Sequence, residues 1–304
     1  MNHQNQQENS ILTIIQSIKP SVAFWFILPS LILPIVLIGY PIFDVFWNSF
    51  HYFSRFGIVK GFVGIDNYLD LFEDEVFLES LIRTFWWTFF VVGFTVLLSL
   101  PIAVILNDNF YGRGIVRTII MLPWAVSLAM NAVVWKWAFN GDIGMINHLL
   151  RQIGILDENI VWFSIAESAF IIEIIIGVIV SIPFTTTILM GGVASIDRDM
   201  YEAATIDGAS PLRQFISLTF PMLKPFINIA LILNIIYVFN SFPLIWIITR
   251  GGPSNGTHLL ITYVYQRAFE FGKVGTGSAG SVVMLCILIV FCVFYFFITR
   301  KKSS

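Results

Sequence analysis

The fold class is decided by the stretch Phe85-Trp-Trp-Thr-Phe-Phe-Val-Val-Gly-Phe-Thr-Val-Leu-Leu-Ser-Leu-Pro-Ile-Ala-Val-Ile-Leu106, which contains no charged residue. A helix of this length, rising 1.5 Å per residue, crosses the roughly 30 Å of hydrocarbon in a bilayer. The whole chain is 57% hydrophobic and only 12% charged, whereas soluble domains carry about 25% charged residues. These observations identify a membrane protein.

Five further apolar segments extend this pattern along the chain. They are Val22–Phe46, Ile115–Phe139, Ser168–Met190, Phe226–Ile248 and Ser281–Thr299. We therefore predict an all-α membrane protein with six transmembrane helices between residues 22 and 299. Six spans place both termini on one side, and the lysine and arginine distribution slightly favours the cytoplasm for that side. Residues 1–21 are predicted to form a polar tail and an interfacial helix, and residues 300–304 a basic tail.

Composition excludes several classes of function. A net charge of −2 without a basic patch argues against a nucleic-acid partner. The two cysteines, Cys286 and Cys292, lie in one apolar run and are interpreted as packed thiols. The four histidines are scattered singly, so the sequence predicts no metal site.

A polar loop, residues 196–225, separates the fourth and fifth predicted spans. It is interpreted as two short helices joined by a tight turn, with acidic residues at the start of the first helix. Gly208 permits a turn with positive φ, and Ser210-Pro211 suits the N-cap and first position of the second helix. We expect Pro221 and Pro225 to end that second helix before the next span begins.

The sequence Glu202-Ala-Ala-Thr-Ile-Asp-Gly208-Ala, followed by Pro221, resembles the EAA loop of ABC-importer permeases. In that family the loop forms the coupling helices that insert into a cleft of the nucleotide-binding subunit. The resemblance assigns the ATPase-coupling role to Tyr201, Glu202, Ala203, Ala204, Asp207, Gly208, Ala209, Phe215 and Pro221.

Flanking motifs resemble the carbohydrate-uptake branch, specifically the first membrane subunit of maltose and glycerol-phosphate importers. They are Phe62-Val-Gly-Ile-Asp-Asn-Tyr68, Asn109-Phe-Tyr-Gly-Arg113 with Leu122-Pro-Trp124, and Thr249-Arg-Gly-Gly-Pro253 with Ala268-Phe269. The resemblance implies a type I ABC permease in a bacterial or archaeal inner membrane, with cytoplasmic termini and a cytoplasmic coupling loop. It also implies three partners: a second permease subunit in a heterodimer, two copies of an ABC ATPase, and an extracytoplasmic solute-binding protein.

Nothing in the chain has the pattern of a catalytic site. Its Gly272-Lys273 pair is followed by Val274 and lacks the remaining residues of a nucleotide-binding P-loop. No serine, histidine and aspartate set or cysteine and histidine set suggests a nucleophile. We therefore expect a non-catalytic subunit without a cofactor of its own, and we expect the partner ATPase to bind ATP and Mg²⁺.

Polar residues within spans are candidates for the substrate path, because they are costly in hydrocarbon and usually face a cavity or another helix. Glu173 lies inside the fourth span. It either lines the cavity and accepts hydrogen bonds from substrate hydroxyls, or sits near the outer end of its span or pairs with a neighbouring helix. In the fifth span, spacing places Asn234, Tyr237 and Ser241 on one face with Asn240 beside them. These four suit either a sugar or interhelical hydrogen bonding, and we favour the sugar because related permeases contact substrate in this region.

The sequence as a whole favours an importer subunit for a sugar or related solute, meaning an oligosaccharide, a polyol or a sugar phosphate. An ABC permease for amino acids or peptides is the near alternative. An ion-coupled secondary transporter is disfavoured because only one ionisable residue, Glu173, stands deep in a span and no internal repeat is visible. A membrane enzyme would need a catalytic set that the chain does not contain.

Overall fold

The computed structural model describes residues 22–300, so the tail and interfacial helix predicted for residues 1–21 lie outside it. The first half of the described chain contains α2 (Val22–Pro34), the π-helical turn η1 (Ile35–Gly39), α3 (Tyr40–Asn48), β1 (His51–Phe53), β2 (Val59–Phe62), α4 (Asp66–Glu73), α5 (Glu75–Asn107), α6 (Arg113–Ala125), α7 (Leu128–Ala138) and α8 (Met145–Gln152). The second half contains α9 (Ala166–Ala194), α10 (Arg198–Ile206), α11 (Pro211–Gln214), η2 (Phe215–Thr219), α12 (Phe220–Phe239), α13 (Phe242–Ile248), α14 (Leu260–Tyr265), η3 (Gln266–Glu270) and α15 (Val274–Arg300).

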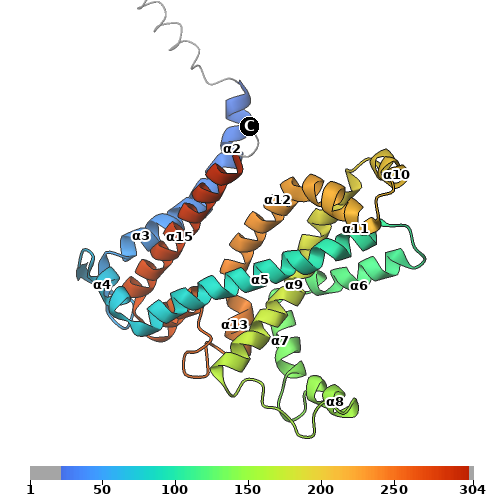
Figure 1. The fold of residues 1–304 in the computed structure, drawn as a ribbon. Helices are drawn as coiled ribbons and strands as arrows, with labels where there is room; N and C mark the ends of the chain where they lie inside the picture. The colour runs from blue at the N-terminus through green and yellow to red at the C-terminus, as the bar shows by residue number, and fades with distance from the viewer. Residues whose placement is uncertain (1–21, 301–304) are drawn as a thin grey trace, which may run out of the picture.

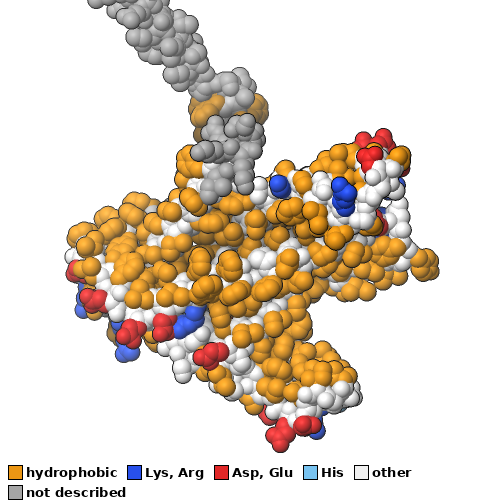
Figure 2. Space-filling model, viewed as in Figure 1, with side chains coloured by type: hydrophobic (Ala, Val, Ile, Leu, Met, Phe, Trp, Pro, Cys, Tyr) orange, Lys and Arg blue, Asp and Glu red, His pale blue; other side chains and the backbone are white. Residues whose placement is uncertain are grey.

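Helices long and apolar enough to cross a membrane dominate the described residues. Five continuous helices meet this test, and the bent pair α6–α7 makes a sixth span if it is counted as one. Figure 2 shows hydrophobic side chains over most of the visible face, with acidic and basic side chains gathered near α4, α8 and α10. The predicted helical membrane fold is therefore confirmed. A short antiparallel hairpin, β1–β2, is added to it, and no alternating run of residues had indicated this hairpin.

The third predicted span is broken rather than straight. Helices α6 and α7 meet at an angle of 99°. Ser127 caps α7, because its hydroxyl accepts a hydrogen bond from the Met130 N–H at 3.2 Å. The side-chain amide of Asn131 donates to the carbonyls of Pro123 and Val126, at 2.9 and 3.1 Å. Asn131 thus satisfies carbonyls that the break leaves without helical partners.

The fifth predicted span, Phe226–Ile248, was wrong at both ends. A continuous helical stretch runs from Pro211 to Phe239, and α13 is a separate short helix. The expectation that Pro221 and Pro225 end the second loop helix was also wrong. The π-helical turn η2 precedes these prolines, and it shifts the hydrogen-bond register so that the Phe220 N–H bonds to the Phe215 carbonyl. The helix therefore continues although proline lacks a donor.

Helices α5, α9 and α12 form the packed centre of the bundle. Trp87 of α5 is fully buried, and its indole N–H donates to the Val238 carbonyl of α12 at 3.0 Å. Gly177 of α9 allows this packing, because a Cβ there would lie 2.9 Å from the Trp87 ring. Helix α15 packs instead against α3 and α4, and Figure 1 shows α3 and α15 as an arm beside the bundle.

The bundle has two distinct ends. The loop end carries α10, α11 and the start of α12, and the end of α15 reaches the same level because the Tyr295 hydroxyl bonds to the Asn228 carbonyl at 3.0 Å. The hairpin end carries β1, β2, α4 and α8, as Figure 1 shows. The start of α5 meets the loop before α14 at this end, where Arg83 bonds to the Asn255 carbonyl.

Two adjacent glycines of α9 give a direct test of the packing between α9 and α12. We expect Gly192→Ala to lower stability by about 1–3 kcal/mol, because the new Cβ would lie 2.6 Å from the Phe226 ring and 2.7 Å from Leu223. Gly191→Ala is the matched control, since that position has open space. Thermal unfolding of the detergent-solubilised protein measures both. An unfolding temperature for Gly192→Ala equal to that of the control would contradict the close approach of the two helices.

Candidate functional site

The loop between α9 and α12 forms a helical hairpin whose turn is centred on Gly208. Gly208 has a φ of 76°, as predicted for this position. Its N–H bonds to the Thr205 carbonyl at 3.0 Å, and the Ala209 N–H bonds to the Ala204 carbonyl at 2.9 Å. This pair of bonds is the Schellman motif that ends many helices. The turn is therefore fixed by backbone hydrogen bonds.

Both loop helices begin at side-chain caps. The Asp197 carboxylate accepts a hydrogen bond from the Asp199 N–H at 3.2 Å and starts α10. The Ser210 hydroxyl accepts from the Arg213 N–H at 3.4 Å and starts α11, with Pro211 at its first position. These caps agree with the sequence prediction of two short helices.

Side chains tie the two loop helices to each other and to α12. The Gln214 amide donates to the Thr205 hydroxyl at 3.0 Å and to the Ala209 carbonyl at 3.1 Å. The hydroxyls of Tyr201 and Thr219 lie 2.9 Å apart, and Thr219 is buried. Because Thr219 ends η2, the loop and α12 are joined into one rigid element. Sequence reasoning had singled out Tyr201 but missed Gln214 and Thr219.

The outer surface of the loop is apolar around the turn. Ile206, Leu212 and Ile216 are 86%, 69% and 58% exposed. An exposed apolar patch with a polar surround is typical of a protein–protein contact. The predicted coupling residues divide into exposed and half-buried groups. Glu202, Ala203, Asp207, Gly208 and Pro221 are exposed, whereas Tyr201, Ala204, Ala209 and Phe215 are half-buried. Ile206 and Leu212 flank the Asp-Gly turn, and that position was the signal that sequence reasoning overlooked.

The residues predicted for the substrate path do not form one stripe. Asn234 is fully buried and points towards α9, where its amide donates to the Thr185 hydroxyl at 2.8 Å. Tyr237 is 46% exposed, and Asn240 is exposed. The prediction of a shared face was wrong because Asn234 turns into the bundle and α12 ends at Phe239, before Ser241. Ser241 is buried in the break between α12 and α13.

Glu173 of α9 binds the segment 249–257 at the hairpin end. The carboxyl group is fully buried, and its Oε1 accepts a hydrogen bond from the Thr249 hydroxyl at 2.8 Å. The Thr257 hydroxyl lies 2.7 Å from that of Thr249, so the two ends of the segment 249–257 meet at Glu173. The bond from Thr249 joins Glu173 to the end of α13, whereas its Oε2 is buried without a hydrogen-bond partner among the described residues.

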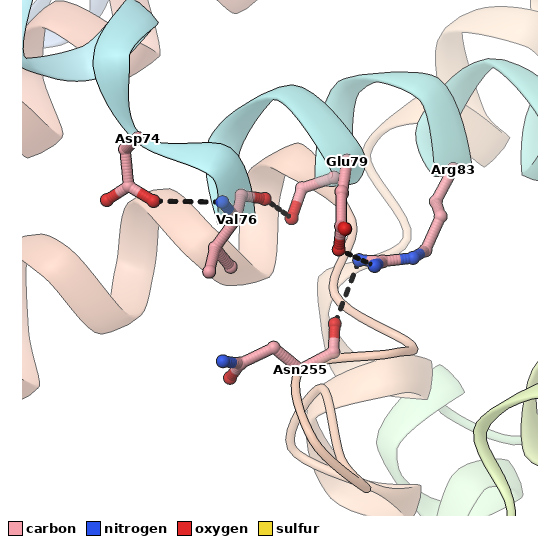
Figure 3. Close-up of polar contacts among 6 residues, drawn as sticks. Asp74, Val76, Glu79, Arg83 and Asn255 are labelled. Carbon is pink, nitrogen blue, oxygen red and sulfur yellow. Dashed lines mark hydrogen bonds and ion pairs between the residues drawn. The ribbon is translucent and has the colours of Figure 1, made fainter.

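Asp74, the N-cap of α5, and Arg83 of α5 contact the segments on either side of α14. Figure 3 shows the bond of Asp74 to Val76 and the bonds of Arg83 to Glu79 and Asn255. The Asp74 carboxylate caps α5 by accepting from the Val76 N–H at 2.9 Å. It also accepts from the Tyr263 hydroxyl at 2.9 Å and forms an ion pair with Arg267. Arg83 pairs with Glu79 and donates to the Asn255 carbonyl at 2.8 Å. The segments on either side of α14 are therefore fixed to the start of α5.

His258 completes this network as a neutral side chain. It is buried, and its Nδ1 lies 3.1 Å from the Thr262 hydroxyl. Burial, together with the positive charges of Arg83 and Arg267, lowers the pKa of His258 to about 4. Among residues 22–300, no group of three or more histidine, cysteine, aspartate or glutamate side chains is arranged to hold a metal ion.

Comparisons with known proteins agree with this architecture. The family model described as "Binding-protein-dependent transport system inner membrane component" matches residues 96–301. A probable ABC transporter permease protein of Brucella suis biovar 1 is 50% identical over 93% of this chain and 99% of that protein. The trehalose/maltose transport system permease protein MalF of Thermococcus litoralis is 33% identical over 98% of this chain and 100% of that protein.

A solved structure shares the fold. It is a bacterial ABC transporter involved in the import of the acidic polysaccharide alginate. The matched chain superposes with a TM-score of 0.82 and is 19% identical, covering 96% of this chain and all of that one.

The two carboxylates near the start of α5 should contribute very differently to stability. We expect Asp74→Ala to cost about 3–5 kcal/mol, because it removes a helix cap and takes from Arg267 a carboxylate that is itself largely buried. Glu79→Ala, the matched control, should cost less than about 1 kcal/mol, because the Glu79 side chain is 58% exposed and Arg83 keeps its bond to the Asn255 carbonyl. Thermal unfolding in detergent measures both changes. Equal losses would show that the Asp74 network does not hold this end of the fold.

Proposed function

The chain belongs to the family of binding-protein-dependent transport system inner membrane components, and from this premise we propose that it is the permease subunit of an ATP-driven importer for a sugar or related solute. The single observation that carries the coupling role is the capped two-helix loop that turns at Gly208, with Ile206 and Leu212 exposed beside the turn. Such a surface fits insertion into a cleft of a partner protein. We assign that cleft to an ABC ATPase.

The ATPase supplies the energy, and this chain transmits it without catalysing a reaction. ATP and Mg²⁺ are bound by the partner, and the chain itself carries no cofactor. Closure of two ATPase copies moves the loop 196–225. That movement reaches α12 directly, because Tyr201 is bonded to Thr219 and the helix then continues unbroken to Phe239. Helix α12 then changes its position against α9, which opens the substrate path to one side of the membrane at a time.

The orientation follows from this assignment. The loop end is cytoplasmic, so both tails of the transmembrane domain 22–299 are cytoplasmic, and the hairpin end faces the solute-binding protein outside. A second, similar permease completes the path. The first span, Phe24–Asn48, leaves its apolar side chains exposed, so it offers surface to the second permease as well as to lipid.

The solute class is proposed from the relatives and from the exposed polar groups near the break in α12. The relative from Thermococcus litoralis is named for trehalose and maltose, and the solved structure is titled for alginate. Tyr237 and Asn240 offer a ring and an amide at the surface of the chain, which suits a sugar better than the charged backbone of an amino acid. Glu173 and Asn234, which are buried and hydrogen-bonded, hold the path in shape.

Gly208→Pro tests the coupling role. Proline cannot adopt a φ of 76° and would remove the N–H that bonds to the Thr205 carbonyl. We expect the variant to insert and fold, but to lose stimulation of the ATPase by solute-loaded binding protein. The measurement is ATP hydrolysis by the complex reconstituted in nanodiscs.

Gly57→Pro is the matched control for that change. Gly57 has a φ of 75° and an N–H bonded to the Ser54 carbonyl, but it lies in the β1–β2 turn at the other end of the fold. The Gly57→Pro variant should keep the ATPase subunits bound in a pull-down assay. The coupling role is refuted if ATP hydrolysis in Gly208→Pro responds to binding protein as the wild type does.

Asn240→Ala tests the substrate path separately. The Asn240 side chain is exposed and bonds only to the Ile236 carbonyl of its own helix, at 2.8 Å, among the described residues. We expect solute uptake into proteoliposomes to fall about tenfold, equivalent to the loss of about 1.4 kcal/mol of solute contact, with no change in unfolding temperature. Asn228→Ala, an exposed asparagine on the same helix, is the control. Uptake kinetics equal to those of the control would remove Asn240 from the path.

A further inference from the structure

Ala268 and Phe269 belong to the π-helical turn η3. Contacts with α15 and with Asp74 hold this turn in position. Ala268 lies against α15, where a Cβ at Gly277 would come within 2.7 Å of the Ala268 Cβ. Tyr263 and Arg267 bond to Asp74. The turn is therefore held from two sides. π-Helical turns are uncommon and often occur at functional sites.

The aromatic side chains of this segment continue a row that begins on α13. The rings of Phe242 and Trp246 are stacked with centroids 5.5 Å apart. Tyr265 joins them, with its ring 4.7 Å from Phe242 and 4.8 Å from Trp246. Phe269 follows at 4.9 Å from Tyr265. We call Phe242, Trp246, Tyr265 and Phe269 the aromatic row.

The row is not a closed core. Phe242, Trp246 and Tyr265 are only half-buried, and Phe269 is 75% exposed. Arg250 is exposed and places its guanidinium 6.0 Å from the centre of the Trp246 ring. Glu270, which follows Phe269, is also exposed. Free ring surface thus lies beside the guanidinium of Arg250, which can donate hydrogen bonds to a ligand.

The aromatic row lies close to the proposed substrate path. It starts two residues after Asn240 and lies next to the loop 249–257, which Glu173 and Arg83 hold at the hairpin end. In the proposed orientation this is the outer end of the bundle, where a solute released by the binding protein first meets the permease. The surfaces are rigid on both sides, because α13 is tied to α7 through Lys136 and the Ile247 carbonyl at 2.7 Å.

We propose that the aromatic row is a contact site for carbohydrate at the outer mouth of the path, with Phe269 as its exposed ring. A sugar ring has an apolar C–H face that suits an aromatic face, and it has hydroxyl edges that suit the guanidinium of Arg250. This inference rests on the proposed function and adds a site that the coupling loop and Asn240 do not contain. A rigid ring contact at the entrance keeps a released solute within the complex while the binding protein is still docked.

The test uses the full complex in proteoliposomes, with both permeases, the ATPase and the binding protein. The solute is the member of a panel of trehalose, maltose, sn-glycerol 3-phosphate and an alginate oligosaccharide that raises the unfolding temperature of the binding protein most, supplied in radiolabelled form. Phe269→Leu keeps an apolar side chain but removes the ring, and Phe269→Tyr keeps the ring. Phe56→Leu, at an exposed phenylalanine in the β1–β2 turn, is the control.

The informative quantity is the number of solute molecules taken up per ATP hydrolysed. We expect this ratio to fall about tenfold in Phe269→Leu, the change that about 1.4 kcal/mol of lost ring contact produces. It should stay near the wild-type value in Phe269→Tyr and Phe56→Leu. Stimulation of the ATPase by loaded binding protein and recovery of all subunits in a pull-down assay should be unchanged in all three variants.

Three outcomes would overturn the inference. An unchanged ratio in Phe269→Leu removes Phe269 from the path. Loss of the second permease or of the binding protein from the Phe269→Leu complex instead makes the row a protein–protein interface. A wild-type complex that takes up no member of the panel overturns the proposed solute class, and the carbohydrate site with it, whereas the first two results leave the proposed function intact.

Discussion

Backbone carbonyls inside the hydrocarbon layer must find hydrogen-bond donors within the protein, because no water is available to them there. Continuous helices meet this demand, but among the described residues two helices, α6 and α12, stop at interior positions. At each stop a side chain from another helix bonds to a carbonyl near the helix end. Asn131 of α7 bonds to the carbonyls of Pro123 and Val126 at the end of α6, and Trp87 of α5 bonds to the Val238 carbonyl near the end of α12. These side chains make the breaks possible.

The breaks in turn arrange the parts that function requires. The end of α12 at Phe239 separates a long rigid helix from the short α13, and the exposed Asn240 lies at the separation. From Pro211 the helical stretch has 29 residues, a length of roughly 44 Å. In the proposed mechanism, a displacement of the Gly208 turn would therefore move the end of α12 near the middle of the bundle, because no break lies between them. Beyond that end, α13, α14 and η3 are bonded to α7, α9 and α5, so the hairpin end would keep its position when α12 moves.

The sequence predicted those features that depend on local composition. Apolar runs located the spans, the acidic residues from Asp197 onward located the start of the first loop helix, and Gly208 and Ser210 located the turn and the cap of the second, because each acts on neighbours within a few residues. The role of Asp197 as the cap of α10 was not predicted. The failures concern partners that are distant in the chain. Thr249 bonds to Glu173 across 76 positions, and Trp87 bonds to Val238 across 151. Hydropathy does not encode such pairs, so neither the end of α12 nor the inward direction of Asn234 was visible. The π-helical turn before Pro221 likewise has no compositional signal.

The carboxylate of Asp74 serves three elements at once, since it caps α5 and holds both Tyr263 of α14 and Arg267 of η3. This sharing limits how the chain can evolve. A neutral replacement at position 74 leaves the largely buried Arg267 without its partner. Loss of Arg267 leaves the anion with only the Tyr263 hydroxyl and the Val76 N–H, so a single change at either position is costly. The tip of the β1–β2 turn has no such constraint, because Phe56 and Gly57 are exposed. Insertions at that turn should therefore cost little stability, whereas the side chains around Asp74 should tolerate replacement only as a matched set.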